Sequence, residues 1–361
     1  MRTSPWRRFV AACSLLLVAF ALLHPHPAAQ AWIYLGVSLA EFGAVFVGLR
    51  RNALGRNAVW LLLAASLIPH VAGNVLWYGS PVLLHRPLPF PSVSDWLFIP
   101  SYVLQLAGLV LLIGRTGQKD RGESLEAAIT AFGAFLIIWV LTIEPALADS
   151  HLTTIGRVVT LSYPMFDIAL AAIAARMFVG GRRRVVSFWL IGASVLVQFA
   201  ADLGYSTSAL RGTFRYGGWV CAAYVLAFLL LGAAALHPSA RSVTTTELAA
   251  GPVRRLPRVI LLGLAAAIGP CLLLLPSVRD DVDVRAMVVA GSLVLIALTL
   301  TRLSGLMIDV EAYRRAQLRL RDAEVRYRSL VEQMPGVVYI AEFGEQGDWI
   351  YVSPKINELL G

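Results

Sequence analysis

The sequence predicts an all-α polytopic membrane protein of about ten transmembrane helices, followed by a charged helix and a short β-hairpin. Three observations lead to this fold class: the apolar content, the recurrence of long apolar runs, and the positions of the basic residues. Of the 361 residues, 58% are hydrophobic and 15% are charged, whereas soluble domains carry about 25% charged residues. So few charges cannot cover a water-exposed surface, which excludes a soluble globular protein.

Ten apolar runs approach or reach the length of about 20 residues that a helix needs to cross the hydrocarbon core. They are residues 9–23, 31–49, 58–78, 96–114, 127–147, 158–179, 185–205, 219–236, 259–275 and 285–303. The first run follows Arg2, Arg7 and Arg8 and precedes Ala29-Gln30-Ala31, so it is also compatible with a cleaved signal peptide. We expect it to be retained as a span, because the later runs make a cleaved leader unnecessary for targeting.

The basic residues predict the orientation of the spans. With the N-terminus inside, the inner stretches hold sixteen Lys and Arg residues and the outer stretches hold six, in accordance with the positive-inside rule. An even number of spans returns the chain to the cytoplasm, so we expect both termini there, in a plasma (inner) membrane. The net charge of +9 then reflects topology and anionic lipid headgroups as partners, and no nucleic-acid surface is needed.

The cysteines and the aromatic residues give less information about the fold and the function. The three cysteines lie in apolar runs without metal-ligand spacing, so neither a disulfide framework nor a metal site is predicted. Aromatic residues at the ends of the apolar runs are expected to form an interfacial belt. These residues are Trp6, Trp32, Trp77, Tyr78, Trp96, Tyr205 and Trp219.

Two stretches of the chain resemble each other. Residues 65–77 align with residues 193–205 at a constant offset, and the alignment pairs His70 with Gln198, Asn74 with Asp202, and Trp77 with Tyr205. Farther on, the tripeptide 102–104 recurs as 224–226. Both aligned spans run from inside to outside, so a genuine repeat would be a parallel duplication of a four-helix unit. Chance matches between apolar segments remain the alternative.

Several polar residues lie within or at the ends of the spans, where ionisable groups usually face a bundle interior. They are Glu41, His70, Asn74, Asp95, Asp167, Gln198, Asp202 and Tyr205. The pairs His70–Asn74 and Gln198–Asp202 are four residues apart, so each pair shares one helix face. The favoured interpretation is that these groups form hydrogen bonds between helices, worth about 0.6 kcal/mol each. The alternative is that the two pairs, with Asp95 and Tyr205, line an outward-open pocket for an ion or for a ligand such as a small-molecule stimulus.

The chain changes character after the last span. We divide it into a transmembrane domain at 1–304, a charged cytoplasmic helix at 305–333 and a β-rich start of a further domain at 334–361. Apolar residues of the charged helix recur in steps of three and four, which is a heptad seam and favours a parallel homodimeric coiled coil over a solvated single helix. The seam residues are Tyr313, Ala316, Leu320, Ala323, Tyr327, Leu330 and Met334.

The β-rich runs 337–341 and 349–352 flank a Gly-containing segment, which predicts a hairpin, and Ser353-Pro354 could begin a helix. The segments RYRSLVEQMPGVVY (326–339), YVSPKI (351–356) and LLG (359–361) resemble the opening of a PAS domain. This resemblance covers about 35 residues, a third of such a domain. It implies an incomplete α+β domain, and the part of the family's pattern that would contact a ligand lies beyond Gly361, so the PAS ligand is unknown.

The membrane part is similar, more loosely, to the multi-span N-terminal region of bacterial signalling proteins, many of them actinobacterial, in which PAS is followed by GGDEF and EAL domains. The segments PFPSVSD (89–95), YPMFD (163–167) and ADLGY (201–205) carry this likeness. It implies a sensor input to cyclic di-GMP signalling. A secondary transporter is the main alternative, and the membrane region of a sensor histidine kinase is a second alternative. The chain contains no catalytic motif and implies no cofactor of its own, so an enzymatic output would belong to a longer parent protein.

Overall fold

The computed structural model describes residues 4–24, 26–86, 88–116, 121–150, 152–179, 185–243, 255–333, 336–341, 349–352 and 356–357. It divides into two compact units, Met1–Arg302 and Leu303–Gly361. The first unit is a helical bundle, and the second holds the charged helix and a two-stranded sheet.

The bundle is built from long apolar helices joined by short connections. The helices are α1 (Pro5–Leu22), α2 (Pro27–Arg51), α3 (Ala58–Asn74), α4 (Ser80–Leu83), α5 (Val93–Thr116), α6 (Arg121–Ile138), α7 (Glu144–Ala148), α8 (Thr154–Val179), α9 (Val186–Leu210), α10 (Trp219–Leu236), α11 (Arg255–Leu272), α12 (Pro276–Arg279) and the start of α13 (Val282–Gln333). A π-helical turn, Val75–Gly79, joins α3 to α4, and a second, Trp139–Ile143, joins α6 to α7. Pro238–Ser242 forms a 3₁₀ turn after α10.

The expectation of a multi-pass helical membrane protein is confirmed. Within the described residues, nine helices are long and apolar enough to cross a membrane, and they coincide with nine of the ten predicted runs. The remaining run, 259–275, corresponds to α11, whose described apolar stretch, Arg258–Leu272, is shorter. Large apolar side chains on the bundle surface, such as Leu15, Ile68 and Leu264, are more than half exposed. Lipid tails would cover such side chains in a membrane.

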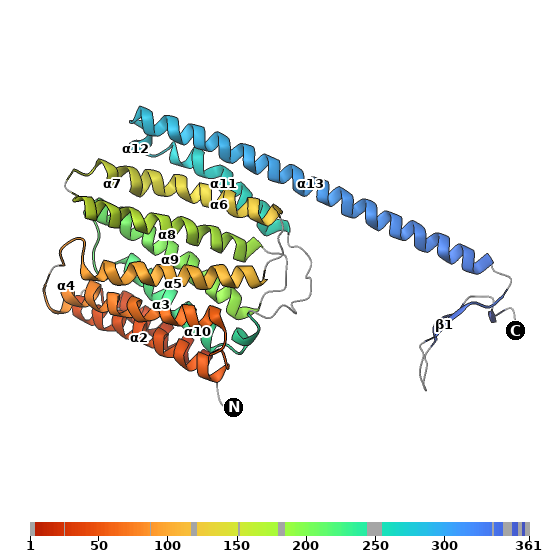
Figure 1. Ribbon diagram of the computed structural model, residues 1–361, viewed down its shortest axis with the longest axis horizontal. Coiled ribbons are helices and arrows are strands. Elements are labelled where there is room, and N and C mark those ends of the chain that lie inside the picture. Colours follow the sequence, from red (N-terminus) through yellow and green to blue (C-terminus); the bar gives the residue numbers. More distant parts are fainter. Residues whose placement is uncertain are drawn as a thin grey trace. The chain divides into compact units, whose positions relative to one another are not determined.

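The helices pack in two rows. Figure 1 shows α2, α3, α5, α8 and α6 side by side, and each contacts the next; α11 continues this row beside α6. A second row consists of α1, α10 and α9, with α10 packed on α2 and α9 packed on α8. Buried apolar side chains, the largest of which is Trp60, fill the space between the rows.

Small residues set the distance between several helices. A Cβ atom on Gly48 of α2 would lie 2.5 Å from the carbonyl oxygen of Ala235 on α10, and one on Gly73 of α3 would lie 2.6 Å from the Phe98 ring of α5. Both contacts are too close for any larger residue. The backbones can approach closely only because these positions lack a side chain, as is typical of membrane helix packing.

In the second unit, most of the helical residues from 311 onward are exposed. The seam residues Tyr313, Leu320 and Tyr327 have more than half of their surface exposed, and so do Leu318 and Val325 on the opposite helix face. The predicted hairpin is present: β1 (Tyr339–Ala341) pairs antiparallel with β2 (Trp349–Val352), and Tyr339 lies opposite Val352. Met334, Ser353 and Pro354 lie outside the described residues.

Candidate functional site

A pocket lies where the two rows of helices meet, beside the π-helical turn that follows α3. Such turns are frequent at functional sites, because the extra residue per turn redirects the side chains that follow. The pocket encloses about 530 Å³, including its open mouth. It is lined by Tyr34, His70, Asn74, Trp77, Asp95, Phe98, Tyr102, Tyr163, Asp202, Tyr205, Ser206 and Tyr224.

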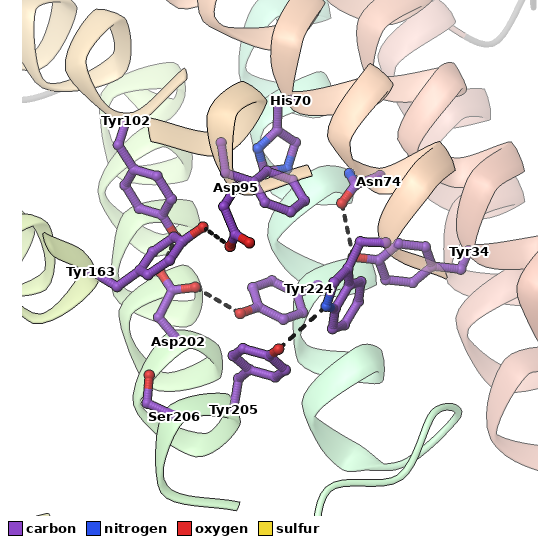
Figure 2. Close-up of a pocket in the computed structure, with 12 residues that line it drawn as sticks. Tyr34, His70, Asn74, Asp95, Tyr102, Tyr163, Asp202, Tyr205, Ser206 and Tyr224 are labelled. Carbon is purple, nitrogen blue, oxygen red and sulfur yellow. Dashed lines mark hydrogen bonds between the residues drawn. The ribbon is translucent and has the colours of Figure 1, made fainter. Parts of the chain in front are cut away.

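Asp202 of α9 accepts hydrogen bonds from two tyrosines on different helices (Figure 2). The hydroxyl group of Tyr102, on α5, donates to Oδ2 over 2.6 Å, and that of Tyr224, on α10, donates to Oδ1 over 2.7 Å. A carboxylate has about four acceptor positions, so each oxygen keeps one that these tyrosines do not use.

Asp95 has a different local role. It is the third residue of α5, and its Oδ2 accepts hydrogen bonds from the backbone N–H of Ser92 over 2.7 Å and from the Ser92 hydroxyl over 2.9 Å. This is the capping-box arrangement, in which a helix N-terminus stabilises an acidic side chain. The other oxygen, Oδ1, accepts a hydrogen bond from Tyr163 of α8 over 2.7 Å, and this bond is drawn in Figure 2.

Aromatic side chains and amides form the opposite wall. The Trp77 indole donates to the Tyr205 hydroxyl over 3.4 Å, and the rings of Tyr34 and Trp77 lie 6.1 Å apart. Asn74 accepts a hydrogen bond from Tyr34 over 3.3 Å and donates one to Ser38 over 3.0 Å. These bonds fix the rings in place, so the wall is formed before any ligand enters.

The loop after α9 supports this wall from outside the spans. Tyr216 donates a hydrogen bond to the carbonyl oxygen of Trp77 over 3.1 Å, and its ring packs at 5.3 Å from that of Trp77. Burial raises the pKa of the Tyr216 hydroxyl, so this group keeps its proton and remains a donor.

A second, smaller cavity shares His70 and Tyr224 with the first. It reaches Glu41 of α2, whose side chain is 2% exposed and whose Oε2 has no hydrogen-bond partner among the described residues. Gln198 lines this cavity and exchanges hydrogen bonds of 2.8 and 3.3 Å with Gln105 of α5. The two cavities place polar groups along one path into the bundle.

Asp167 of α8 lies behind the pocket rather than in its wall. Its carboxyl group is buried within hydrogen-bonding reach of Asp202, and its Oδ1 has no hydrogen-bond partner among the described residues. Asp202 therefore has a second buried acidic residue next to it, one that is not among the residues lining the pocket.

The predicted site residues are largely brought together. His70, Asn74, Asp95, Asp202 and Tyr205 line one pocket. Gln198 does not line it, because it lies a turn deeper on α9 and faces the second cavity; Glu41 lies there too. The first cavity is lined by the predicted residues near one end of the spans, and the second is lined by those nearer the middle.

The assignment of three aromatic residues to an interfacial belt is wrong. Trp77 and Tyr205 line the pocket, and Tyr78 is completely buried against Tyr34, with ring centroids 4.6 Å apart. The π-helical turn rotates this part of the chain inward, which the sequence pattern did not reveal. Of the other boundary residues, Trp32, Trp96 and Trp219 are each more than 60% exposed, as a belt requires, whereas Trp6 is partly buried.

Seven of the twelve residues that line the pocket were not predicted as site residues from the sequence. They are Tyr34, Trp77, Phe98, Tyr102, Tyr163, Ser206 and Tyr224. The internal alignment contained a signal for two of them, because it pairs Tyr102 with Tyr224. These two tyrosines occupy matching places, one on each oxygen of Asp202. The aligned residues Trp77 and Tyr205 also meet each other across the pocket.

A second buried acidic site lies near the start of α6. The Glu126 carboxylate forms an ion pair with Arg302 of α13 over 2.7 Å and another with Arg258 of α11 over 3.8 Å. All three side chains are less than 10% exposed. A Cβ atom on Gly122 would overlap the Arg302 guanidinium, so α6 accommodates this side chain only because glycine stands there. The sequence pattern placed Arg258 in a cytoplasmic loop and did not single out Glu126.

No family model, curated protein or solved structure matches this chain. Among the described residues, no group of three or more His, Cys, Asp or Glu side chains could hold a metal ion. The fold and the site therefore define only a class: a polytopic helical membrane protein with a preformed pocket of aromatic and carboxyl groups between two rows of helices.

Proposed function

We propose that the chain is the membrane-integral sensory part of a signalling protein, in which the pocket receives a stimulus and α13 passes the signal to a PAS module. The observation that carries this proposal is that α13 is one helix of 52 residues, from Val282 to Gln333. At about 1.5 Å per residue it is roughly 80 Å long, far more than the hydrocarbon core of about 30 Å requires. A rotation or shift of its apolar half is transmitted directly to its charged half.

The Glu126 site supports this proposal, because it connects α13 to the rest of the bundle. Arg302 lies at the end of the apolar half of α13, and its ion pair joins this helix to α6, while Arg258 joins α11 to the same carboxylate. The bundle would have two arrangements whose free energies differ by a few kcal/mol, and α13 would be rotated or shifted in one relative to the other. A stimulus that binds one arrangement better shifts the population towards it.

The remaining parts of the proposal rest on the sequence. The bundle lies in the plasma membrane with both termini in the cytoplasm and its basic residues near anionic headgroups. The seam between residues 305 and 333 joins two copies in parallel. In the parent protein the output is turnover of cyclic di-GMP or, as an alternative, a histidine kinase reaction.

A secondary transporter is favoured by one observation, the two adjoining cavities that lead from Asp95 and Asp202 towards Glu41. Transporter sites are typically formed by helices broken near the middle of the membrane. Here α3, α8 and α11 remain helical through Pro69, Pro164 and Pro270. If the chain, reconstituted into proteoliposomes, takes up a solute and Asp202→Asn abolishes this uptake, the transporter function is established.

Disulfide cross-linking tests the dimer that the sensor requires. The chain should be expressed in membranes with the exposed Cys271 replaced by alanine, and a cysteine introduced at either Leu320 or Leu318. Both leucines are exposed on the same helix, but only Leu320 lies on the seam. We expect dimers from Leu320→Cys and few from Leu318→Cys. Equal cross-linking at the two positions would contradict the proposed seam.

A further inference from the structure

We propose that the pocket between the two rows of helices binds a small organic cation, an ammonium group with an apolar body. The inference deepens the sensor proposal by naming the class of stimulus, and only its role as a stimulus rests on that proposal. Three observations carry it: acidic groups without a cationic partner in the pocket, an aromatic wall, and an unpartnered carboxylate oxygen in the adjoining cavity.

The acidic groups of the pocket have no cationic partner in the part of the chain that the structure describes. Asp202 is bonded by two tyrosine hydroxyls and lies beside the carboxyl group of Asp167, and Asp95 is bonded by a tyrosine, a serine and a backbone N–H. Neither Lys nor Arg occurs among the described residues that line the two cavities. A buried carboxylate without a counter-ion is costly, and a bound cation removes that cost. The same arrangement repels anions.

Seven of the twelve residues that line the pocket are aromatic: Tyr34, Trp77, Phe98, Tyr102, Tyr163, Tyr205 and Tyr224. Aromatic faces attract organic cations, and cages of such rings recognise quaternary ammonium groups. A small inorganic ion gains less from such rings, because it needs a shell of oxygen ligands. The apolar wall therefore favours an ammonium ion that carries carbon substituents. Figure 2 shows the rings of Tyr163, Tyr205 and Tyr224 gathered around the carboxyl groups of Asp95 and Asp202.

The third observation comes from the adjoining cavity. Glu41 is almost fully buried, and its Oε2 lacks a hydrogen-bond partner among the described residues. It faces a cavity that meets the aromatic pocket at His70 and Tyr224. An N–H or hydroxyl group on the body of a ligand can reach toward this oxygen. The pocket and the adjoining cavity therefore both carry buried acidic groups, Asp95 and Asp202 in the first and Glu41 in the second.

Calorimetric titration tests the ligand class. The full chain should be purified in dodecyl maltoside, because this detergent has an uncharged sugar head group and adds no ammonium ions. The probes are choline and benzyltrimethylammonium, with 3,3-dimethylbutan-1-ol as the neutral carbon analogue of choline. We expect at least one cation to bind about tenfold or more tightly than the neutral analogue. Equal or tighter binding of the neutral compound would overturn the proposal.

Variants locate the binding site. Asp202→Asn should weaken cation binding about tenfold or more, and Trp77→Leu should weaken it by a smaller factor while keeping an apolar side chain. Asp283→Asn removes an exposed acid at the start of α13 and is the matched control; it should bind like the unmodified chain. Unchanged binding by both pocket variants would overturn the proposal. The comparison between choline and its neutral analogue needs no variant, so it stands even where a variant fails to fold.

Two further probes separate the sources of the cation. A short-chain phosphatidylcholine carries the same ammonium group as choline on a lipid, and tighter binding of choline than of this lipid identifies a free solute; the reverse order identifies a lipid headgroup. If sodium chloride gives the same binding signal as choline in the same titration, the site accepts an inorganic cation, and this result would overturn the proposal. Failure of these titrations leaves the cross-linking test of the seam unaffected, so the two proposals can fail separately.

Discussion

The bundle contains two buried acidic sites that are neutralised in opposite ways. Glu126 is paired with Arg258 and Arg302, so its charge is balanced within the protein. Asp202, in the pocket, receives hydrogen bonds from the hydroxyl groups of Tyr102 and Tyr224 instead. Both carboxylates are at most 5% exposed, so burial alone does not distinguish them.

The difference indicates separate roles. A carboxylate that has its own arginines joins helices together, and Glu126 joins α6 to α11 and α13. A carboxylate held by neutral donors beside a cavity leaves its charge for a ligand. The first kind of site should therefore be sensitive to any loss of charge, whereas the second should tolerate neutralisation and lose only binding.

The largest effect is expected for Glu126→Ala. This change removes the carboxylate that pairs with two buried arginines, and breaking a buried ion pair in this way costs about 3–5 kcal/mol of the free energy of unfolding. Unfolding in mixed micelles of dodecyl maltoside and dodecyl sulfate measures it. The matched control is Glu324→Ala, whose ion pair with Arg328 is exposed on α13 and is worth less than about 1 kcal/mol. A loss at Glu126 no larger than that at Glu324 would contradict the structural role.

Gly122→Ala should have the next largest effect. The added methyl group would overlap the Arg302 guanidinium, so either α6 or the arginine must move, at a cost of about 1–3 kcal/mol. Gly114→Ala is the control, because a Cβ atom there meets no other atom within 4 Å. We expect Gly114→Ala to be neutral or slightly stabilising in the same unfolding assay. Equal effects of the two changes would show that Arg302 does not pack on α6.

Tyr224→Phe tests how the pocket holds its acid. It removes one of the two hydrogen bonds to Asp202, and a hydrogen bond to a charged group contributes about 1.5–3 kcal/mol, of which the neighbouring Tyr102 bond will recover part. The exposed Tyr313 provides the control variant Tyr313→Phe, since its hydroxyl bonds only at the surface of α13. A stability unchanged from that of the control would indicate that Asp202 does not depend on these tyrosines.

The smallest effect on stability is expected for Asp202→Asn. The amide can still accept a hydrogen bond from one tyrosine and donate to the oxygen of the other, and a buried charge is removed, so the free energy of unfolding should change by about 1 kcal/mol or less. Unfolding in the same mixed micelles gives the value. A loss as large as that of Glu126→Ala would eliminate the distinction between the two sites.

The sequence predicted the membrane class and most of the polar residues of the pocket for a physical reason. Lipid contact demands long apolar runs, and an ionisable group such as Asp202 within a run must face the bundle interior. The helical spacing of four residues then placed His70 with Asn74 and Gln198 with Asp202 on shared faces. These constraints are local, so they can be read from one stretch of chain.

The tyrosines and the arginine pair could not be predicted in this way. Tyr102 and Tyr163 look like ordinary apolar-run residues until packing brings Tyr102 to Asp202 of α9 and Tyr163 to Asp95 of α5. The inward turn of Trp77 depends on one extra residue in a π-helical turn. Glu126 lies at the edge of its run, and its partners come from helices more than 100 residues farther along the chain. Contacts of this kind depend on tertiary packing, which the local pattern does not contain.

The central claim is that a cation in the pocket changes the arrangement of α13. The most direct measurement is the rate of disulfide formation by Leu320→Cys in the Cys271→Ala background, with and without saturating choline. It is made in two chains, one that keeps Asp202 and one that carries the Asp202→Asn substitution. We predict that choline changes the rate by about twofold or more in the first chain and leaves it unchanged in the second. The same rate with and without choline in the chain that keeps Asp202, at a concentration that calorimetry shows to be saturating, would contradict the claim.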